Sequence, residues 1–188
     1  MFLPWEDMKG ILFIIRNPFD ATIAEWKRQK GGGHTSQADE EIFKRENWES
    51  MARASLKRWA DLIRNVFEKH TGVNTKGQKI PLHIILYEDM VRNATLEMSR
   101  VLDFIEKENY FFVDDRSSRL RCLTKALLET EKFHRKKKPP SFEYFSEELI
   151  DEGNKYIEEG LLLLIENDFP LVDIIKYKKK HTASTSLP

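Results

Sequence analysis

The stretch Gly10-Ile11-Leu12-Phe13-Ile14-Ile15-Arg16-Asn17-Pro18 decides the fold class of this sequence. Residues 10–15 form a continuous apolar run, which is typical of a strand covered on both faces in a parallel sheet. Asn17 is a good helix N-cap and Pro18 suits the first helical position, so we expect a helix from there to about Lys30. Arg16 is therefore placed at the C-terminal end of a buried strand, directly before a helix.

The sequence downstream predicts a second strand and several more helices. Apolar residues recur at three- and four-residue spacing from Trp48, which indicates a long amphipathic helix that ends at Gly72. A second apolar run at 82–87 predicts a strand, and a helix is expected over about 95–106. Further helical patterns cover 117–130 and 147–167. This order predicts an α/β fold, mostly helical by residue count, with a parallel sheet flanked by helices.

Composition and charge exclude several classes of protein. At 188 residues the chain is long enough for one domain with its own core. Lys plus Arg equals Asp plus Glu at 31 each, so no overall field attracts nucleic acid. The longest apolar runs are far below the roughly 20 residues of a membrane helix, so no span is predicted. Cys122 is the only cysteine, which excludes an internal disulfide and a cysteine-based zinc site, and no metal is expected.

Arg16 is the first candidate for a binding role. A guanidinium beside the free backbone N–H groups of a helix start is well suited to a phosphate. On its own, however, Arg-Asn-Pro also ends a strand and caps a helix without any ligand. Leu86-Tyr87-Glu88-Asp89-Met90 ends the second strand and opens toward the same C-terminal edge, where ligands bind in open α/β sheets. The two features together favour a phosphate site at this edge.

Arg16-Asn17-Pro18-Phe19-Asp20 and the later Tyr87-Glu88-Asp89-Met90 resemble the sulfotransferase family, in an order that extends from about Leu3 to about Pro140. That family transfers a sulfuryl group from 3′-phosphoadenosine 5′-phosphosulfate to a hydroxyl or amine. The resemblance implies a P-loop-NTPase-like sheet, this adenine nucleotide as co-substrate, and an acceptor that the sequence does not identify. Ala24-Glu25-Trp26 is similar to the branch that carries a WSC domain, which implies a Golgi membrane location for the parent protein, with the cytoplasm as alternative.

The resemblance also implies roles for individual residues. Arg16 would contact the 3′-phosphate of the donor, and Tyr87 would lie near its adenine, with a strand-end core position as the alternative for Tyr87. A basic stretch would cover the same phosphate; its candidates are Arg135, Lys136 and Lys137, and a solvated loop is the alternative. The family's serine eight residues after the arginine is Ala24 here, so that hydroxyl contact is not expected.

No catalytic residue is predicted in this chain. The family's 5′-phosphosulfate loop and its catalytic base would lie before the equivalent of Leu3, so the chain is interpreted as a fragment truncated at its N-terminus. A sulfotransferase fragment is the leading hypothesis, and a non-catalytic binding protein derived from a sulfotransferase is the alternative. Zero net charge argues against a nucleic-acid binder, and the absence of GxxxxGK[ST] argues against ATP chemistry.

Two further predictions concern organisation and modification. Residues 1–175 are expected to form one partial domain, and 176–188 a basic, disordered tail. Asn93-Ala94-Thr95 is a glycosylation sequon that has meaning only in the secretory pathway. Asn93 also lies at an expected helix start, where capping explains it equally well.

Overall fold

The computed structural model describes residues 9–30, 40–44, 47–70, 77–108, 110–130, 143–169 and 172–180. The chain forms two compact units, which are described separately. The first contains Met1–Arg16 and Glu68–Pro139, and the second contains Asn17–Phe67 and Pro140–Pro188. The chain therefore leaves the first unit immediately after Arg16 and returns to it at Glu68.

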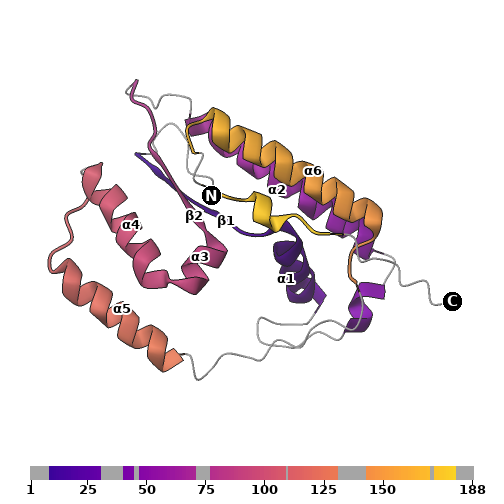
Figure 1. Cartoon of the computed structure of the whole chain (residues 1–188), viewed down its shortest axis with the longest axis horizontal. Coiled ribbons are helices and arrows are strands. Elements are labelled where there is room, and N and C mark those ends of the chain that lie inside the picture. The colour runs from indigo at the N-terminus through magenta and orange to yellow at the C-terminus, as the bar shows by residue number, and fades with distance from the viewer. Residues whose placement is uncertain are drawn as a thin grey trace. The chain divides into compact units, whose positions relative to one another are not determined.

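The first unit contains a parallel pair of strands, β1 (Ile11–Ile15) and β2 (Leu82–Leu86). The two strands lie side by side in Figure 1, and their register runs from Ile11 opposite Leu82 to Ile15 opposite Leu86. The predicted α/β fold is confirmed. The prediction that Tyr87 still belongs to the strand is wrong, because Leu86 is the last extended residue (φ −82°, ψ 123°) and the chain turns into a helix at Tyr87.

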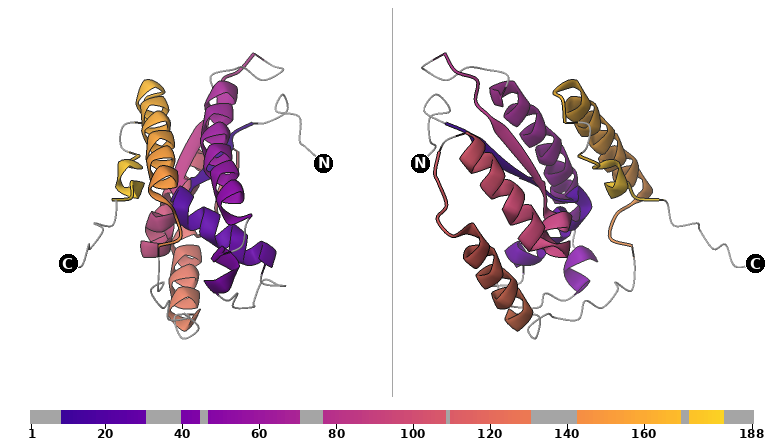
Figure 2. Two further views of the ribbon diagram at one scale, coloured as in Figure 1. Left: turned by 90° about the vertical axis from the view of Figure 1, so that its right-hand side faces the viewer. Right: turned by 60° about the vertical axis from the view of Figure 1, so that its left-hand side comes forward.

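Three helices complete the described part of the first unit: α3 (Tyr87–Arg92), α4 (Ala94–Lys107) and α5 (Arg116–Thr130). Helix α4 lies alongside β2 (Figure 2), and the ring of Phe104 stacks on that of His83 at 5.4 Å between centroids. The hydroxyl groups of Thr95 and Thr124 join α4 to α5 at 2.9 Å. The helices predicted for 95–106 and 117–130 are confirmed.

His83 makes the first unit sensitive to pH. Burial lowers the pKa of this half-buried imidazole, Glu97 opposes the shift, and Arg100 adds to it. Its Nε2 has no hydrogen-bond partner among the described residues, so no hydrogen bond stabilises a proton there. Because the unfolded chain titrates near pH 6.5, the unfolded state binds the proton more tightly. The stability contributed by neutral His83 is full above about pH 6.5 and is lost as the pH falls below it.

We expect urea unfolding to show a lower free energy of unfolding at about pH 5.5 than at about pH 7.5, and a smaller loss in His83→Leu. The leucine keeps an apolar contact for Phe104 and cannot take up a proton. The difference between the two losses in free energy of unfolding reports on His83 alone, because the other four histidines are present in both proteins. Equal losses in both proteins would contradict this account.

The second unit is helical in its described part. It contains α1 (Pro18–Lys30), η2 (Glu40–Lys44), most of α2 (Trp48–His70), α6 (Glu147–Glu166) and η4 (Ile175–Tyr177). Arg53 on α2 pairs with Glu148 at 3.1 Å and with Glu152 on α6. Gly153 permits a close approach of α6 to α1, because a Cβ at this position would lie 2.5 Å from Cζ of Phe19. The predicted long helix from Trp48 and the final helix are confirmed.

The chain after α6 includes a short helix, η4, and a contact back to α6. Tyr177 is buried within η4, and the backbone N–H and C=O of Lys179 both bond to the side chain of Asn154 at 2.9 Å. Residues 176–180, the first part of the predicted tail, are thus among the described residues, and Lys179 contacts α6. Residues 181–188 lie outside the described part of the chain.

Candidate functional site

Arg16 and Tyr87 follow the two paired strands directly. Because Ile15 lies opposite Leu86, the next residue of each strand leaves the sheet at the same C-terminal edge. The guanidinium carbon of Arg16 lies 4.6 Å from the centre of the Tyr87 ring, within the range of a cation–π contact. Arg16 is half-buried, while Tyr87 is 38% exposed. The structure thus brings together two of the residues that the sequence singles out.

This contact suits a phosphate-binding arginine. A guanidinium over an aromatic face is oriented through its charge and its flat surface, so the contact does not use its N–H donors. Those donors form a rigid fork whose spacing matches the oxygens of a carboxylate or phosphate. The exposed part of the Tyr87 ring offers an apolar surface for a planar group. An anion and an attached aromatic ring system are the ligand features that this pair fits.

The helix start after Arg16 is less available to an anion than the sequence suggests. Pro18 has no backbone N–H, and Oδ1 of Asn17 accepts from the N–H of Phe19 at 3.0 Å and of Asp20 at 3.4 Å. The first donors of α1 are therefore taken by the helix's own cap. The expectation of free N–H groups beside Arg16 is corrected accordingly, and any phosphate contact rests mainly on side chains.

The remainder of α1 supplies no obvious replacement for the missing serine. Ala24 has no hydroxyl, and Thr22 is 3% exposed, so its hydroxyl lies in the core. Arg28 donates two hydrogen bonds to Glu25, which together with Gln29 lower the pKa of that carboxyl to about 2. Arg28 and Glu25 on this helix are thus occupied with one another.

Comparisons with known proteins agree with the residue pattern at this edge. The sequence profile of the sulfotransferase domain matches residues 5–161. The chain belongs to the sulfotransferase family. It is 26% identical over 163 residues to the WSCD family member CG9164 of Drosophila melanogaster, covering 84% of this chain and 46% of that protein. It is 29% identical over 147 residues to the WSCD family member GA21586 of Drosophila pseudoobscura pseudoobscura, covering 76% and 41%.

This sulfotransferase chain therefore spans a little under half the length of the curated relatives it matches. No solved structure matches it. Within the described residues, no helix is long and apolar enough to cross a membrane. No cluster of His, Cys, Asp and Glu that could hold a metal ion occurs in the same part of the sulfotransferase chain.

Other residues proposed for the sulfotransferase site are not placed by the structure. Arg135, Lys136 and Lys137 lie outside the described residues, so their predicted contact with a phosphate stays a prediction. Sequence reasoning placed Arg16 and Tyr87 at one edge but did not anticipate their stacking. The strand pairing accounts for the shared edge, because residues that follow a matched pair in parallel strands emerge side by side, but it does not specify the contact between the two side chains.

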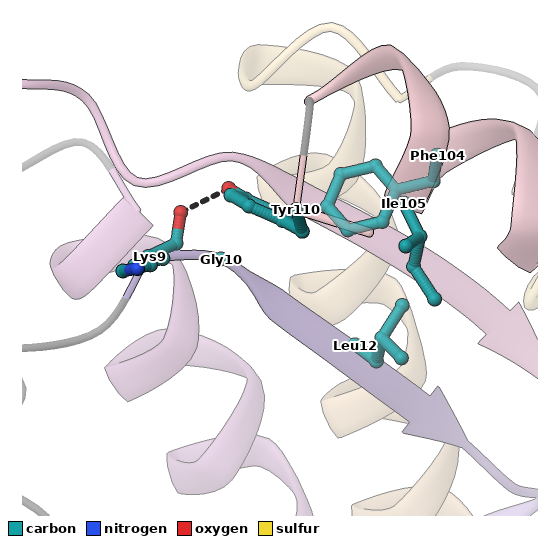
Figure 3. A pocket seen from close by; sticks show the side chains of 6 residues that line it. All are labelled: Lys9, Gly10, Leu12, Phe104, Ile105 and Tyr110. Atoms are coloured by element: carbon teal, nitrogen blue, oxygen red, sulfur yellow. Dashed lines mark hydrogen bonds between the residues drawn. The ribbon is translucent and has the colours of Figure 1, made fainter. Parts of the chain in front are cut away.

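A pocket of about 300 Å³ lies in the first unit (Figure 3). Its lining consists of Lys9, Gly10, Leu12, Phe104, Ile105 and Tyr110. The Tyr110 hydroxyl donates to the backbone oxygen of Lys9, and a Cβ at Gly10 would lie 2.7 Å from that hydroxyl. Gly10 and Arg16 are separated by about 20 Å of extended chain, so the pocket lies at the opposite end of β1 from the candidate site of the sulfotransferase.

Proposed function

We propose that this chain provides the donor-nucleotide side of a sulfotransferase that uses 3′-phosphoadenosine 5′-phosphosulfate. The observation that carries the proposal is the contact of Arg16 with Tyr87, at 4.6 Å, where the paired strands end. Arg16 would hold the 3′-phosphate, and the exposed surface of Tyr87 would contact the adenine. Membership of the sulfotransferase family supports this assignment.

The residues present fit this nucleotide. The 3′-phosphate is a compact dianion at neutral pH, and a guanidinium can meet it with two parallel charge-assisted hydrogen bonds. Arg135, Lys136 and Lys137 are proposed to add positive charge around the same group. The nucleotide supplies the sulfuryl group, which a hydroxyl or amine acceptor would receive in the whole protein. In this chain, the described residues bind and orient the donor.

We further propose that the parent protein is anchored in the Golgi membrane with its sulfotransferase domain in the lumen. The similarity to two WSCD family members supports this location, since the WSC-type branch is the one that Ala24-Glu25-Trp26 resembles. The cytoplasm is the alternative compartment.

Calorimetric titration with adenosine 3′,5′-bisphosphate tests the proposal, with 5′-AMP as the matched ligand that lacks only the 3′-phosphate. We expect the bisphosphate to bind at least about 30-fold more tightly, since even about 2 kcal/mol for the phosphate contacts gives such a ratio. Equal affinity for both nucleotides, or no binding by a folded sample, would contradict the assignment of Arg16. In that case the alternative of a binding protein that has lost the nucleotide site would be favoured.

A further inference from the structure

The junction between α3 and α4 carries the single N-x-S/T sequence of the chain, Asn93-Ala94-Thr95. Such a sequence is an acceptor for N-linked glycans when its asparagine is accessible in the lumen of the secretory pathway. The donor-site proposal makes no use of this asparagine. Its geometry decides whether the folded unit could carry a glycan there.

Asn93 is tied into the structure through its backbone and through one atom of its side chain. Its N–H donates to the carbonyl oxygen of Asp89 at 2.8 Å, and its own carbonyl accepts from the N–H of Glu97 at 3.1 Å. Oδ1 caps α4 by accepting from the N–H of Leu96 at 3.1 Å. None of the hydrogen bonds found among the described residues uses Nδ2. Capping and glycan attachment therefore use different atoms of the same amide.

The surroundings of Asn93 are open. The residue itself is exposed, and so are Val91 at 65% and Leu96 at 46%. The Arg92 side chain is 72% exposed, although it pairs with Asp89. Nothing described within the first unit encloses the amide. A glycan on Nδ2 has room to extend into solvent without displacing a packed side chain.

We propose that Asn93 carries an N-linked glycan, attached through Nδ2 while Oδ1 continues to cap α4. This inference rests on the lumenal location in the proposed function. The donor is a lipid-linked oligosaccharide diphosphate, used by a membrane-bound transferase of the secretory pathway. A bond forms between Nδ2 and the anomeric carbon, the bond from that carbon to the diphosphate oxygen breaks, the diphosphate leaves with the electron pair, and the amide gives up one proton.

The order of folding and modification also follows from the contacts. In the folded unit, the Thr95 hydroxyl is bonded to Thr124 of α5 at 2.9 Å, and this hydroxyl is the element of the sequon that the transferase recognises. Transfer before α5 docks onto α4 would leave this hydroxyl free for the transferase. The completed structure accommodates the glycan because Nδ2, unlike the threonine hydroxyl, is not engaged in that contact.

The chain offers a matched control at the start of α5. Asp115 is exposed, and its Oδ1 accepts from the N–H of Ser118 at 3.2 Å, as Asn93 does from the third residue after it. Asp115 has a φ of 49°, a conformation that asparagine tolerates well. The substitution Asp115→Asn therefore creates a second sequon with Ser117 at another exposed helix cap and keeps the capping geometry.

The test uses the chain secreted behind a cleavable signal peptide, together with the protein isolated from its own cells. Peptide N-glycosidase should remove one glycan and convert Asn93 to aspartate in both samples. Mass spectrometry detects both changes. Thr95→Ala should carry no glycan although the Asn93 cap is intact, Thr95→Ser should keep it, and Asp115→Asn should carry two.

Three results would overturn the inference: modification at position 115 but not at Asn93 in the Asp115→Asn variant, persistence of the glycan in Thr95→Ala, or its absence from the protein of native cells. The nucleotide titration has a separate readout. A glycosylated chain that binds no nucleotide would contradict the proposed function but not the glycan at Asn93. An unmodified chain that binds adenosine 3′,5′-bisphosphate would contradict the glycan at Asn93 but not the proposed function.

Discussion

Replacing Arg16 with alanine is expected to lower the affinity for adenosine 3′,5′-bisphosphate by about 100-fold and to abolish the preference over 5′-AMP. Removing one partner of a desolvated charged pair costs about 2–5 kcal/mol, and every 1.4 kcal/mol is tenfold in affinity. The half-buried guanidinium over the Tyr87 ring is already oriented before the ligand binds, so little entropy is lost on binding. Calorimetric titration of both nucleotides measures the change.

Two further variants sharpen this test. Arg16→Lys keeps the charge but loses the planar fork, so we expect an affinity between those of the native protein and the alanine variant. Arg92→Ala is the matched control, since Arg92 lies on α3 of the same unit, is 72% exposed and pairs with Asp89 at 3.3 Å. Its affinity for the bisphosphate should be unchanged. Native affinity in folded Arg16→Ala would assign the 3′-phosphate to other residues.

The strands and helices could be predicted from the sequence because their signals are local. The apolar run before Arg16 and the three- and four-residue spacing in α2 each depend only on the residues of that element. The start of α3 at Tyr87 was missed because the apolar run continues through this residue, while its backbone conformation is set by the chain that follows. The division into two units follows from contacts between distant segments, which periodicity does not report.

The candidate site was predictable in position but not in detail. The order of the elements predicts a parallel pair, and a parallel pair brings Arg16 and Tyr87 to one edge. The stacking of their side chains depends on rotamers, which no sequence pattern gives. The capping of α1 by Asn17 was predicted, but its consequence was not: one asparagine takes the N–H groups of both Phe19 and Asp20. A good cap and an open anion site compete for the same donors.

Trp26, the last residue of the stretch Ala24-Glu25-Trp26, packs in the core of the second unit. Its side chain is 2% exposed, its Nε1 donates to the carbonyl oxygen of Ile42 at 3.1 Å, and its ring lies 5.8 Å from that of Trp48. Trp48 in turn packs against Phe43 at 4.8 Å and Phe145 at 5.4 Å. This aromatic cluster connects α1, η2, α2 and the chain before α6 within the second unit.

Trp26→Ala is therefore expected to lower the free energy of unfolding by about 3–5 kcal/mol, as measured by urea denaturation followed by circular dichroism. The change leaves a cavity among aromatic rings and removes the donor from the buried Ile42 carbonyl, so relaxation cannot recover both losses. Trp26→Phe keeps most of the volume and should lose less, about 1–2 kcal/mol. Arg28→Ala, which removes an exposed pair with Glu25, should lose far less than Trp26→Ala, because exposed ion pairs contribute little to stability. Since a domain has only about 5–15 kcal/mol in total, a loss in Trp26→Ala no larger than in Arg28→Ala would show that the second unit is stabilised elsewhere.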